Sequence, residues 1–249
     1  MRSWAPILVT ALLLSACSGR LVKKQYEYEE ELYLGLDGSA TLNVNASVPA
    51  LVALRGADVN PAARARFDRD RIRAFFQGPG VNINALSASR RYGRRFVHVS
   101  MDVTDVRALQ RVAPFAWSTY RFAREGDIYE FKQTVGAPAG KSVGDVGWDG
   151  TELVAFRMHL PSKIAYQNAP SHRTERGNIV EWEQMLTDRL HGVPIDIDVQ
   201  METQSILART LLLFGMTILA AFATLAAIVW WMARKGQGAG GSGQEAAGS

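Results

Sequence analysis

The chain has 249 residues, a formal net charge of +4, a hydrophobic content of 47% and one cysteine. A single cysteine excludes an intramolecular disulfide framework, and this hydrophobic content excludes a chain that is disordered throughout. Between two apolar ends, residues 18–205 are enough for one domain with a packed core and short for two.

Residues 1–17 have the pattern of a bacterial secretory signal. Arg2 precedes an apolar run over residues 4–14, which is too short to span a bilayer, and small residues follow it. The four residues Leu14-Ser15-Ala16-Cys17 look like a lipobox, in which the cysteine receives a diacylglyceryl group. We therefore expect lipidation at Cys17. Chance placement of the cysteine and an uncleaved anchor are the alternatives.

Two local patterns organise the first part of the domain. Residues 26–36 and 40–48 alternate between apolar and polar positions on either side of Asp37-Gly38, which predicts a β-hairpin. Asn60-Pro61 has the form of a helix start and Gly78-Pro79 that of a helix end, so we expect a helix between them.

An arginine-rich segment follows this helix. Strands are expected at residues 81–87 and 96–101, and the connection carries Arg90, Arg91, Arg94 and Arg95. A guanidinium group matches the geometry of phosphate oxygens. The four arginines are therefore candidate contacts to anionic head groups, although the solubility of an exposed turn explains them equally well.

The rest of the domain is predicted to be mostly strand. We expect a short helix at residues 105–113, capped by Thr104, and a hairpin of residues 115–122 and 128–135. A glycine-rich loop at 136–150 follows, and then strands at 154–160, 179–186 and 193–201. Residues 18–205 therefore form an extracytoplasmic α+β domain with a mostly antiparallel sheet and about two helices.

The run from Thr210 to Met232 contains no charged side chain. As a helix it would be about 34 Å long, enough to cross a hydrocarbon core of about 30 Å. We expect a transmembrane helix over residues 206–233. Arg209 precedes the run, and aromatic and basic residues follow it at the second interface: Trp230, Trp231, Arg234 and Lys235.

The topology follows from these two ends. A signal at residues 1–17 sends the domain across the cytoplasmic membrane of a bacterium, and residues 234–249 form a glycine-rich tail expected to be disordered in the cytoplasm. The domain itself is divided in charge, because residues 55–124 carry 14 Lys or Arg and 5 Asp or Glu, whereas residues 125–205 carry 7 and 13. Outside the cytoplasm, the basic half would meet anionic lipids or polyanionic polymers and not nucleic acid. A solvated arginine face is the alternative.

Motifs for catalysis and cofactor binding are missing from the sequence. It contains no HExxH, GxSxG or phosphate-binding glycine loop, and its four histidines are scattered. Neither the pair Asp145/Asp149 nor the pair Asp196/Asp198 has the spacing of a calcium-binding loop. The first pair fits an ordinary glycine-rich loop, and the second fits the solvent-exposed face of a strand. We therefore expect no catalytic residues, no metal and no cofactor.

Four short segments resemble the LppM domain family of membrane-anchored bacterial envelope proteins. They are LSAC at residues 14–17, DGSATL at 37–42, MHLPSK at 158–163 and GNIVEW at 177–182. The resemblance implies sheet and helices like those of lipid-binding folds, an apolar cavity, and a role in binding or handling envelope glycolipids. It brings no catalytic residues.

The sequence thus favours a membrane-anchored envelope lipoprotein whose domain binds a lipid or another amphipathic ligand, such as a glycolipid, beside the bilayer. One alternative is a structural or assembly protein of a membrane complex that has no small-molecule ligand. A weaker alternative is an envelope hydrolase with a dispersed site. The protein partner and the oligomeric state are not predicted.

Overall fold

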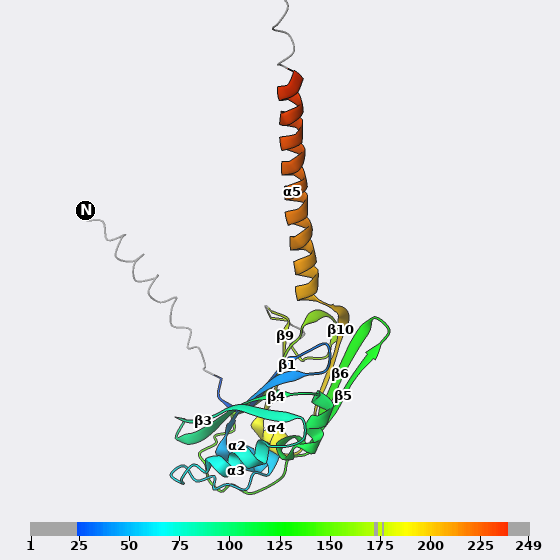
Figure 1. The fold of residues 1–249 in the computed structure, drawn as a ribbon. Helices are drawn as coiled ribbons and strands as arrows, with labels where there is room; N and C mark the ends of the chain where they lie inside the picture. Colours follow the sequence, from blue (N-terminus) through cyan, green and yellow to red (C-terminus); the bar gives the residue numbers. More distant parts are fainter. Residues whose placement is uncertain (1–23, 172–173, 176, 239–249) are drawn as a thin grey trace, which may run out of the picture.

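The structure is a computed structural model, and it describes residues 24–171, 174, 175 and 177–238. Two β-sheets and one long C-terminal helix dominate the fold (Figure 1). Sheet A has six strands in the order β3-β4-β2-β1-β7-β9, and sheet B has four in the order β5-β6-β10-β8. The predicted α+β class is confirmed.

Neighbouring strands pair antiparallel, except that β1 and β7 are parallel. The strands of sheet A are β1 (Tyr26–Leu34), β2 (Ala40–Ser47), β3 (Val81–Arg91), β4 (Arg94–Val103), β7 (Leu153–His159) and β9 (Ile179–Met185). Those of sheet B are β5 (Ser118–Glu125), β6 (Ile128–Val135), β8 (Ser162–Gln167) and β10 (Ile195–Ser205). The helices are α2 (Val48–Arg55), α3 (Arg69–Phe76), α4 (Leu186–Leu190) and α5 (Ile206–Gly238), with 3-10 turns η2 (Val106–Arg111) and η3 (Ala113–Phe115).

The hairpins predicted from turn signals are present. Leu34 lies opposite Ala40, so β1 and β2 close on Asp37-Gly38 as expected. β3 pairs with β4 and β5 pairs with β6 along their full lengths. The strands expected around residues 154–160, 179–186 and 193–201 correspond to β7, β9 and β10.

The helix predictions need correction. The helix expected between Asn60 and Gly78 begins only at Arg69, because the side chain of Asp68 caps it by accepting from the amide of Arg71 at 3.0 Å. The short helix expected at 105–113 is a 3-10 helix over Val106–Arg111, and it is capped by Asp105 and not by Thr104. Strand β8 and helices α2 and α4 were not predicted.

Helix α2 is the centre of the core. All eight of its residues are buried, and Ser47 caps its start by accepting from the amide of Ala50 at 3.1 Å. Residues 136–152, which we call the strap, have no helix or strand and cross its other end. The amides of Ala139 and Gly140 there donate to the carbonyls of Leu54 and Ala53, both at 3.1 Å. The strap therefore pairs two of the terminal carbonyls of a helix that is almost fully buried.

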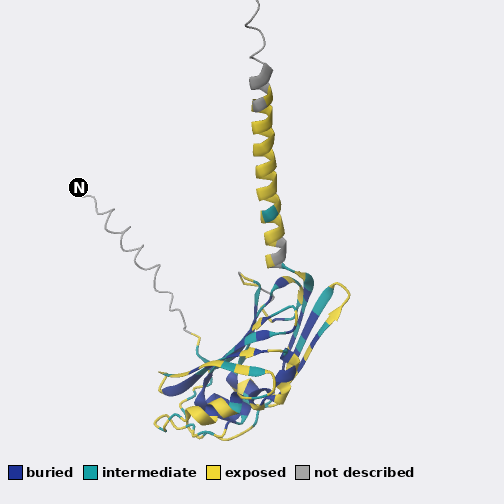
Figure 2. Ribbon diagram, viewed as in Figure 1, coloured by how far each residue is buried: buried dark blue, intermediate teal, exposed yellow. Residues whose placement is uncertain are grey.

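Helix α5 follows β10 directly, since Ser205 ends the strand and Ile206 begins the helix. Its segment Thr210–Met232 has a mean hydropathy of 2.4 and is long and apolar enough to cross a membrane. Figure 2 shows this helix exposed along its length, whereas the facing sides of the two sheets are buried. An apolar surface of this size is stable in lipid and not in water.

The ends of the predicted span can be compared with the structure in part. The helix runs to Gly238, so residues 234–238 of the predicted disordered tail are helical. Trp230 and Trp231 are exposed, and the guanidinium of Arg234 lies 4.4 Å from the ring centre of Trp230. Arg209 and Lys235 lie in the helix, but their side chains are outside the description. Cys17, the signal sequence and residues 239–249 also lie outside the described residues.

Candidate functional site

The face of sheet A that points away from the core carries a row of paired charges. Strand alternation places Glu29, Glu31 and Tyr33 of β1 on this face. The guanidinium of Arg157 on β7 binds Glu29 at 2.6 Å and Glu181 of β9 at 2.7 Å. These contacts cross three neighbouring strands and hold their outer side chains in fixed positions.

The row continues to the side chain of Glu183. Lys24 donates to Glu183 at 2.7 Å, and the hydroxyl of Tyr26 also donates to it. Burial and this hydrogen bond raise the pKa of Tyr26 to about 12. Burial alone would raise the pKa of Glu183, but the hydrogen bonds from Lys24 and Tyr26 hold it below its usual range. Glu183 is therefore an ionised acceptor at neutral pH.

A groove of about 790 Å³ opens at one end of this sheet. We call this the groove end, where β1, β4 and β7 finish and β2 and β3 begin. The lining residues come from all five strands and the loops beside them: Tyr33, Leu34, Ala40, Thr41, Val81, Asp102, Val103, His159, Leu160 and Pro161. Its volume lies within the range of small-molecule sites, about 300–1,000 Å³.

The groove combines apolar walls with a few fixed polar groups. Thr41 donates to Asp102 across the β2–β4 pair at 3.0 Å. The imidazole of His159 lies 2.7 Å from Glu31 and stacks on the ring of Tyr33, with 3.9 Å between ring centres. Leu160 and Pro161 extend the apolar part. Such a surface can bind hydroxyl or amide groups along one side and hydrocarbon along the other.

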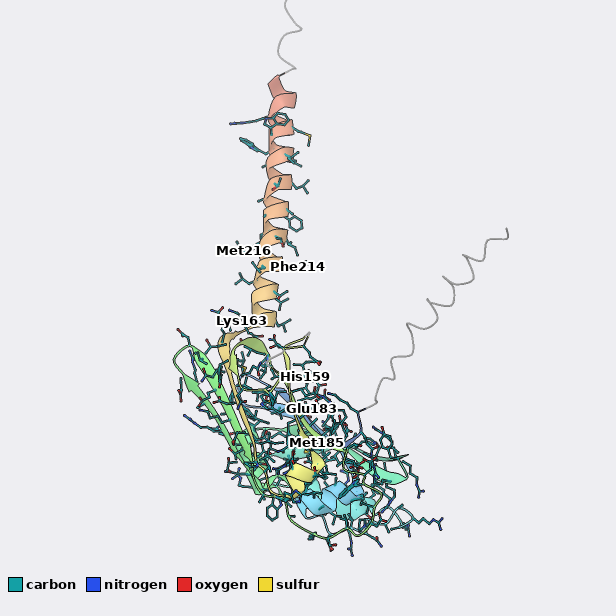
Figure 3. All side chains as sticks on the ribbon, turned by 180° about the vertical axis from the view of Figure 1, so that it is seen from behind. His159, Lys163, Glu183, Met185, Phe214 and Met216 are labelled. Carbon is teal, nitrogen blue, oxygen red and sulfur yellow. The ribbon has the colours of Figure 1, made fainter. Side chains whose placement is uncertain are left out.

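The groove lies next to the start of α5. Pro161 is followed by Ser162, which pairs with Ser205, the last residue of β10. The next residue of the chain begins α5. Figure 3 shows Lys163 at the base of this helix and His159 below it, in the part of the domain nearest to α5. If α5 spans a bilayer, the groove faces the zone of the lipid head groups.

The space between the two sheets is filled. The gap beside Leu32, Leu42, Phe156 and Ile197 measures only about 10 Å³. This is too little for a lipid chain and about the minimum for one water. The apolar cavity that the family resemblance implied is therefore absent from this gap, and the open groove is the candidate binding space.

The four predicted arginines do not form one surface. Arg90 and Arg91 are exposed beside the tight turn Tyr92-Gly93, but Arg94 and Arg95 are buried. Arg94 pairs with Glu27 at 2.7 Å, and Arg95 donates to the carbonyl of Asn60 at 2.8 Å. The prediction of one exposed patch is therefore wrong for Arg94 and Arg95, whose side chains lie inside the domain. Contact through Arg90 and Arg91 stays a prediction.

The turn of these arginines also lies far from α5. It is at the end of β3 opposite the groove, at the lower left of Figure 1, and we call this side the arginine end of sheet A. The first ten residues of β3 rise about 33 Å. A bilayer crossed by α5 would therefore not be the surface that Arg90 and Arg91 face.

The acidic pairs considered for metal binding have other roles. Asp145 accepts from the amide of Gly147 at 3.0 Å, and Asp149 accepts from the amide of Thr151 at 2.9 Å. Asp196 accepts from the hydroxyl of Thr134 at 2.8 Å. Within the described part of the chain, no group of three or more His, Cys, Asp or Glu side chains could hold a metal ion.

The residues of the groove were not identified from the sequence. Tyr33, Thr41, Asp102 and His159 come from four strands that are distant in the chain. Each fits the ordinary polar position of a two-faced strand. The only local signal was Pro161, which marks the end of β7 in the segment MHLPSK.

Comparisons with known proteins add little to this geometry. No protein-family model matches the sequence, and no curated protein matches it significantly. Among solved structures, the NMR structure of the folded domain of Mycobacterium tuberculosis LppM aligns with a TM-score of 0.36 and 14% identity. The alignment covers 74% of this chain and 94% of that one. A likeness at this level establishes neither a shared family nor a shared function.

Proposed function

We propose that this chain is a single-pass membrane protein of the bacterial envelope whose domain binds a lipid or another amphipathic ligand in the groove of sheet A, without catalysing a reaction. The position of the groove carries this proposal, because only Ser162 and its partner Ser205 separate Pro161 from the start of α5. A lipid head group would meet Thr41, Asp102 and His159, and its hydrocarbon would follow Leu160 and Pro161 towards the bilayer.

The proposed orientation depends on the two ends of the chain. A secretory signal and a lipid anchor at Cys17 would place the domain outside the cytoplasmic membrane, with α5 crossing that membrane. Protease added to intact spheroplasts should then digest residues 24–205 and spare the glycine-rich tail. Digestion of the tail alone would show that the orientation is the opposite of the proposed one.

Native mass spectrometry of the full chain extracted in mild detergent tests the ligand. We expect the wild-type protein to carry an adduct with the mass of a lipid. Thr41→Trp should remove this adduct, because an indole at this position fills the groove. Asn43→Trp is the matched control, since Asn43 lies two residues further along β2, is half-buried on the same face and does not line the groove.

Two outcomes would contradict the proposal. If repeated preparations of the wild-type protein carry no lipid, the groove has no such ligand and a ligand-free assembly protein becomes the better explanation. If both tryptophan variants lose the adduct equally while their thermal unfolding is unchanged, the lipid binds elsewhere.

A further inference from the structure

A second cavity, of about 160 Å³, lies at the arginine end of sheet A, beside the segment that precedes α3. The guanidinium-bearing residues Arg66, Arg71 and Arg95 line it, together with one acidic residue, Asp68. Arg95 and the groove residue Val103 are eight positions apart on β4, which corresponds to about 26 Å. This cavity is therefore separate from the groove.

Arg95 is the most informative residue of the cavity. It is only 7% exposed, and its Nη2 donates to the carbonyls of Asn60 at 2.8 Å and Ala62 at 3.3 Å. Its Nε has no hydrogen-bond partner, and no carboxylate of the described residues lies within ion-pair distance. Burial, and then the nearby charge of Arg90, lower the pKa of Arg95. Leaving a buried charge without a counter-ion is strongly unfavourable.

Three other arginines of the described chain are buried. Arg94 pairs with Glu27 and Arg55 pairs with Glu30, both at 2.7 Å. Arg189 has only backbone carbonyls as partners, as Arg95 does, but none of its buried nitrogens lacks a hydrogen bond, whereas Nε of Arg95 does. Arg95 is next to Arg94 in the chain and is similarly buried, but it has only neutral carbonyls as partners. The charge that would balance Arg95 is therefore missing from the described chain.

The remaining lining residues add to the positive charge. Arg66 is exposed and forms no ion pair within the described residues. Arg71 contacts Asp58 at 3.4 Å and Asp68 at 3.3 Å, and these long contacts are open to solvent. Asp68 also accepts from the amide of Arg71 at 3.0 Å, so its carboxylate is already engaged. The lining of the cavity thus carries three guanidinium groups and one carboxylate, and a second carboxylate, that of Asp58, contacts Arg71 from outside the lining.

We propose that this cavity binds a phosphate-type oxyanion, either free phosphate or the phosphate group of an ester. Arg66 and Arg71 supply charge-assisted donors, and the anion supplies the counter-charge for Arg95. A cavity needs only about 10–15 Å³ to hold one water, so 160 Å³ holds a tetrahedral oxyanion and some of its water.

Thermal unfolding of the full chain in neutral detergent tests the site, with inorganic phosphate compared with chloride at constant pH and ionic strength. We expect phosphate, and not chloride, to raise the melting temperature with a saturable dependence on concentration. Arg66→Gln should weaken the apparent phosphate affinity about tenfold, which corresponds to the loss of one charge-assisted contact. Because Arg66 is exposed, this variant should fold normally.

Arg64→Gln is the matched control, since Arg64 is an exposed arginine of the same segment that does not line the cavity. It should keep the wild-type affinity. The absence of a saturable difference between phosphate and chloride would overturn the proposal. Equal weakening in Arg64→Gln and Arg66→Gln would also overturn it, because it would indicate general charge screening.

A second arm identifies the source of the phosphate. The full chain in nanodiscs is mixed with separate vesicles of phosphatidylcholine, with or without phosphatidic acid. Docking that requires phosphatidic acid, is competed by inorganic phosphate and is lost in Arg66→Gln supports the site with a lipid phosphate as ligand. Saturable phosphate binding without docking to the vesicles supports the site with a soluble phosphate compound as its ligand. Docking that responds to neither phosphate nor Arg66→Gln counts against the cavity.

Discussion

The two ends of sheet A are built from similar residues but differ in burial. At the arginine end, Glu27 is fully buried, and it accepts from Arg94 at 2.7 Å and from the indole of Trp148 at 3.1 Å. At the groove end, Glu31 accepts from Tyr33 at 3.1 Å and contacts His159, and the side chains of all three are partly open to water.

For these two glutamates, burial separates an ion pair that holds the fold from one that can exchange its partner. A buried ion pair cannot exchange its partner for water, so removing one member destabilises the charge left behind. An exposed pair exchanges its partner for water at little cost. The contacts of Glu31 can therefore rearrange, whereas the Glu27–Arg94 pair fixes the strap and the first residues of β1.

Among the variants considered, Glu27→Gln should lower the free energy of unfolding the most. A small effect would contradict the difference between the two ends of the sheet. The variant leaves the buried Arg94 with only the carboxylate of Glu152, at 3.9 Å, as its counter-ion, and we expect a loss of about 3 kcal/mol in the free energy of unfolding. Urea unfolding of the full chain in detergent measures this loss. The matched variant Glu31→Gln, four residues along the same strand, should lose less than about 1 kcal/mol. Equal losses would show that burial does not distinguish the two ends.

Trp148→Phe should lower the free energy of unfolding by an intermediate amount. It removes the hydrogen bond to Oε2 of Glu27 but leaves Arg94 on Oε1, so we expect a loss of about 1.5 kcal/mol. The strap should also become more sensitive to limited proteolysis. Trp117→Phe is the control, because Trp117 is exposed and should change stability by less than about 0.5 kcal/mol. Unchanged cleavage of the strap in Trp148→Phe would contradict this role.

Replacing His98 should change the free energy of unfolding the least, and this change should appear only at acidic pH. Burial, and then the positive charge of Arg91, lower the pKa of His98 below 6.5. The unfolded chain therefore takes up this proton first, so the stabilisation is complete above about pH 6.5 and is lost as the pH falls through the lower, folded-state pKa. Unfolding measured against pH should show a shallower acid loss in His98→Gln than in the wild type. Identical curves of stability against pH for the two proteins would exclude His98 as a contributor to the loss of stability in acid.

The parts of the fold that follow from local sequence were predicted. Asp37-Gly38 fixes a hairpin by itself, and an uncharged run such as Thr210–Met232 has few alternatives to a long apolar helix. Helix α2 was missed because Val48–Arg55 is apolar on nearly every side, so it has no amphipathic period and reads as the continuation of β2.

The sites depend on contacts between distant segments. Arg94 and Arg95 look like the other arginines of their turn, but Glu27 is 67 positions away from Arg94 in the chain and Trp148 reaches Glu27 from the strap. The groove likewise needs five strand ends to meet. Neither arrangement has a local signature, so composition suggested a basic surface where the structure has one exposed and one buried pair of arginines.

If α5 spans a bilayer, the absence of a linker between Ser205 and Ile206 couples the thickness of that bilayer to the domain. The apolar segment Thr210–Met232 is about 34 Å long as a helix, and a span longer than the hydrocarbon core adapts by tilting. Since β10 continues directly into α5, a change in the tilt of α5 is transmitted to Ser205 and, through its partner Ser162, to Pro161 at the rim of the groove. A thinner or thicker membrane would therefore alter the width of that rim without any change in the chain.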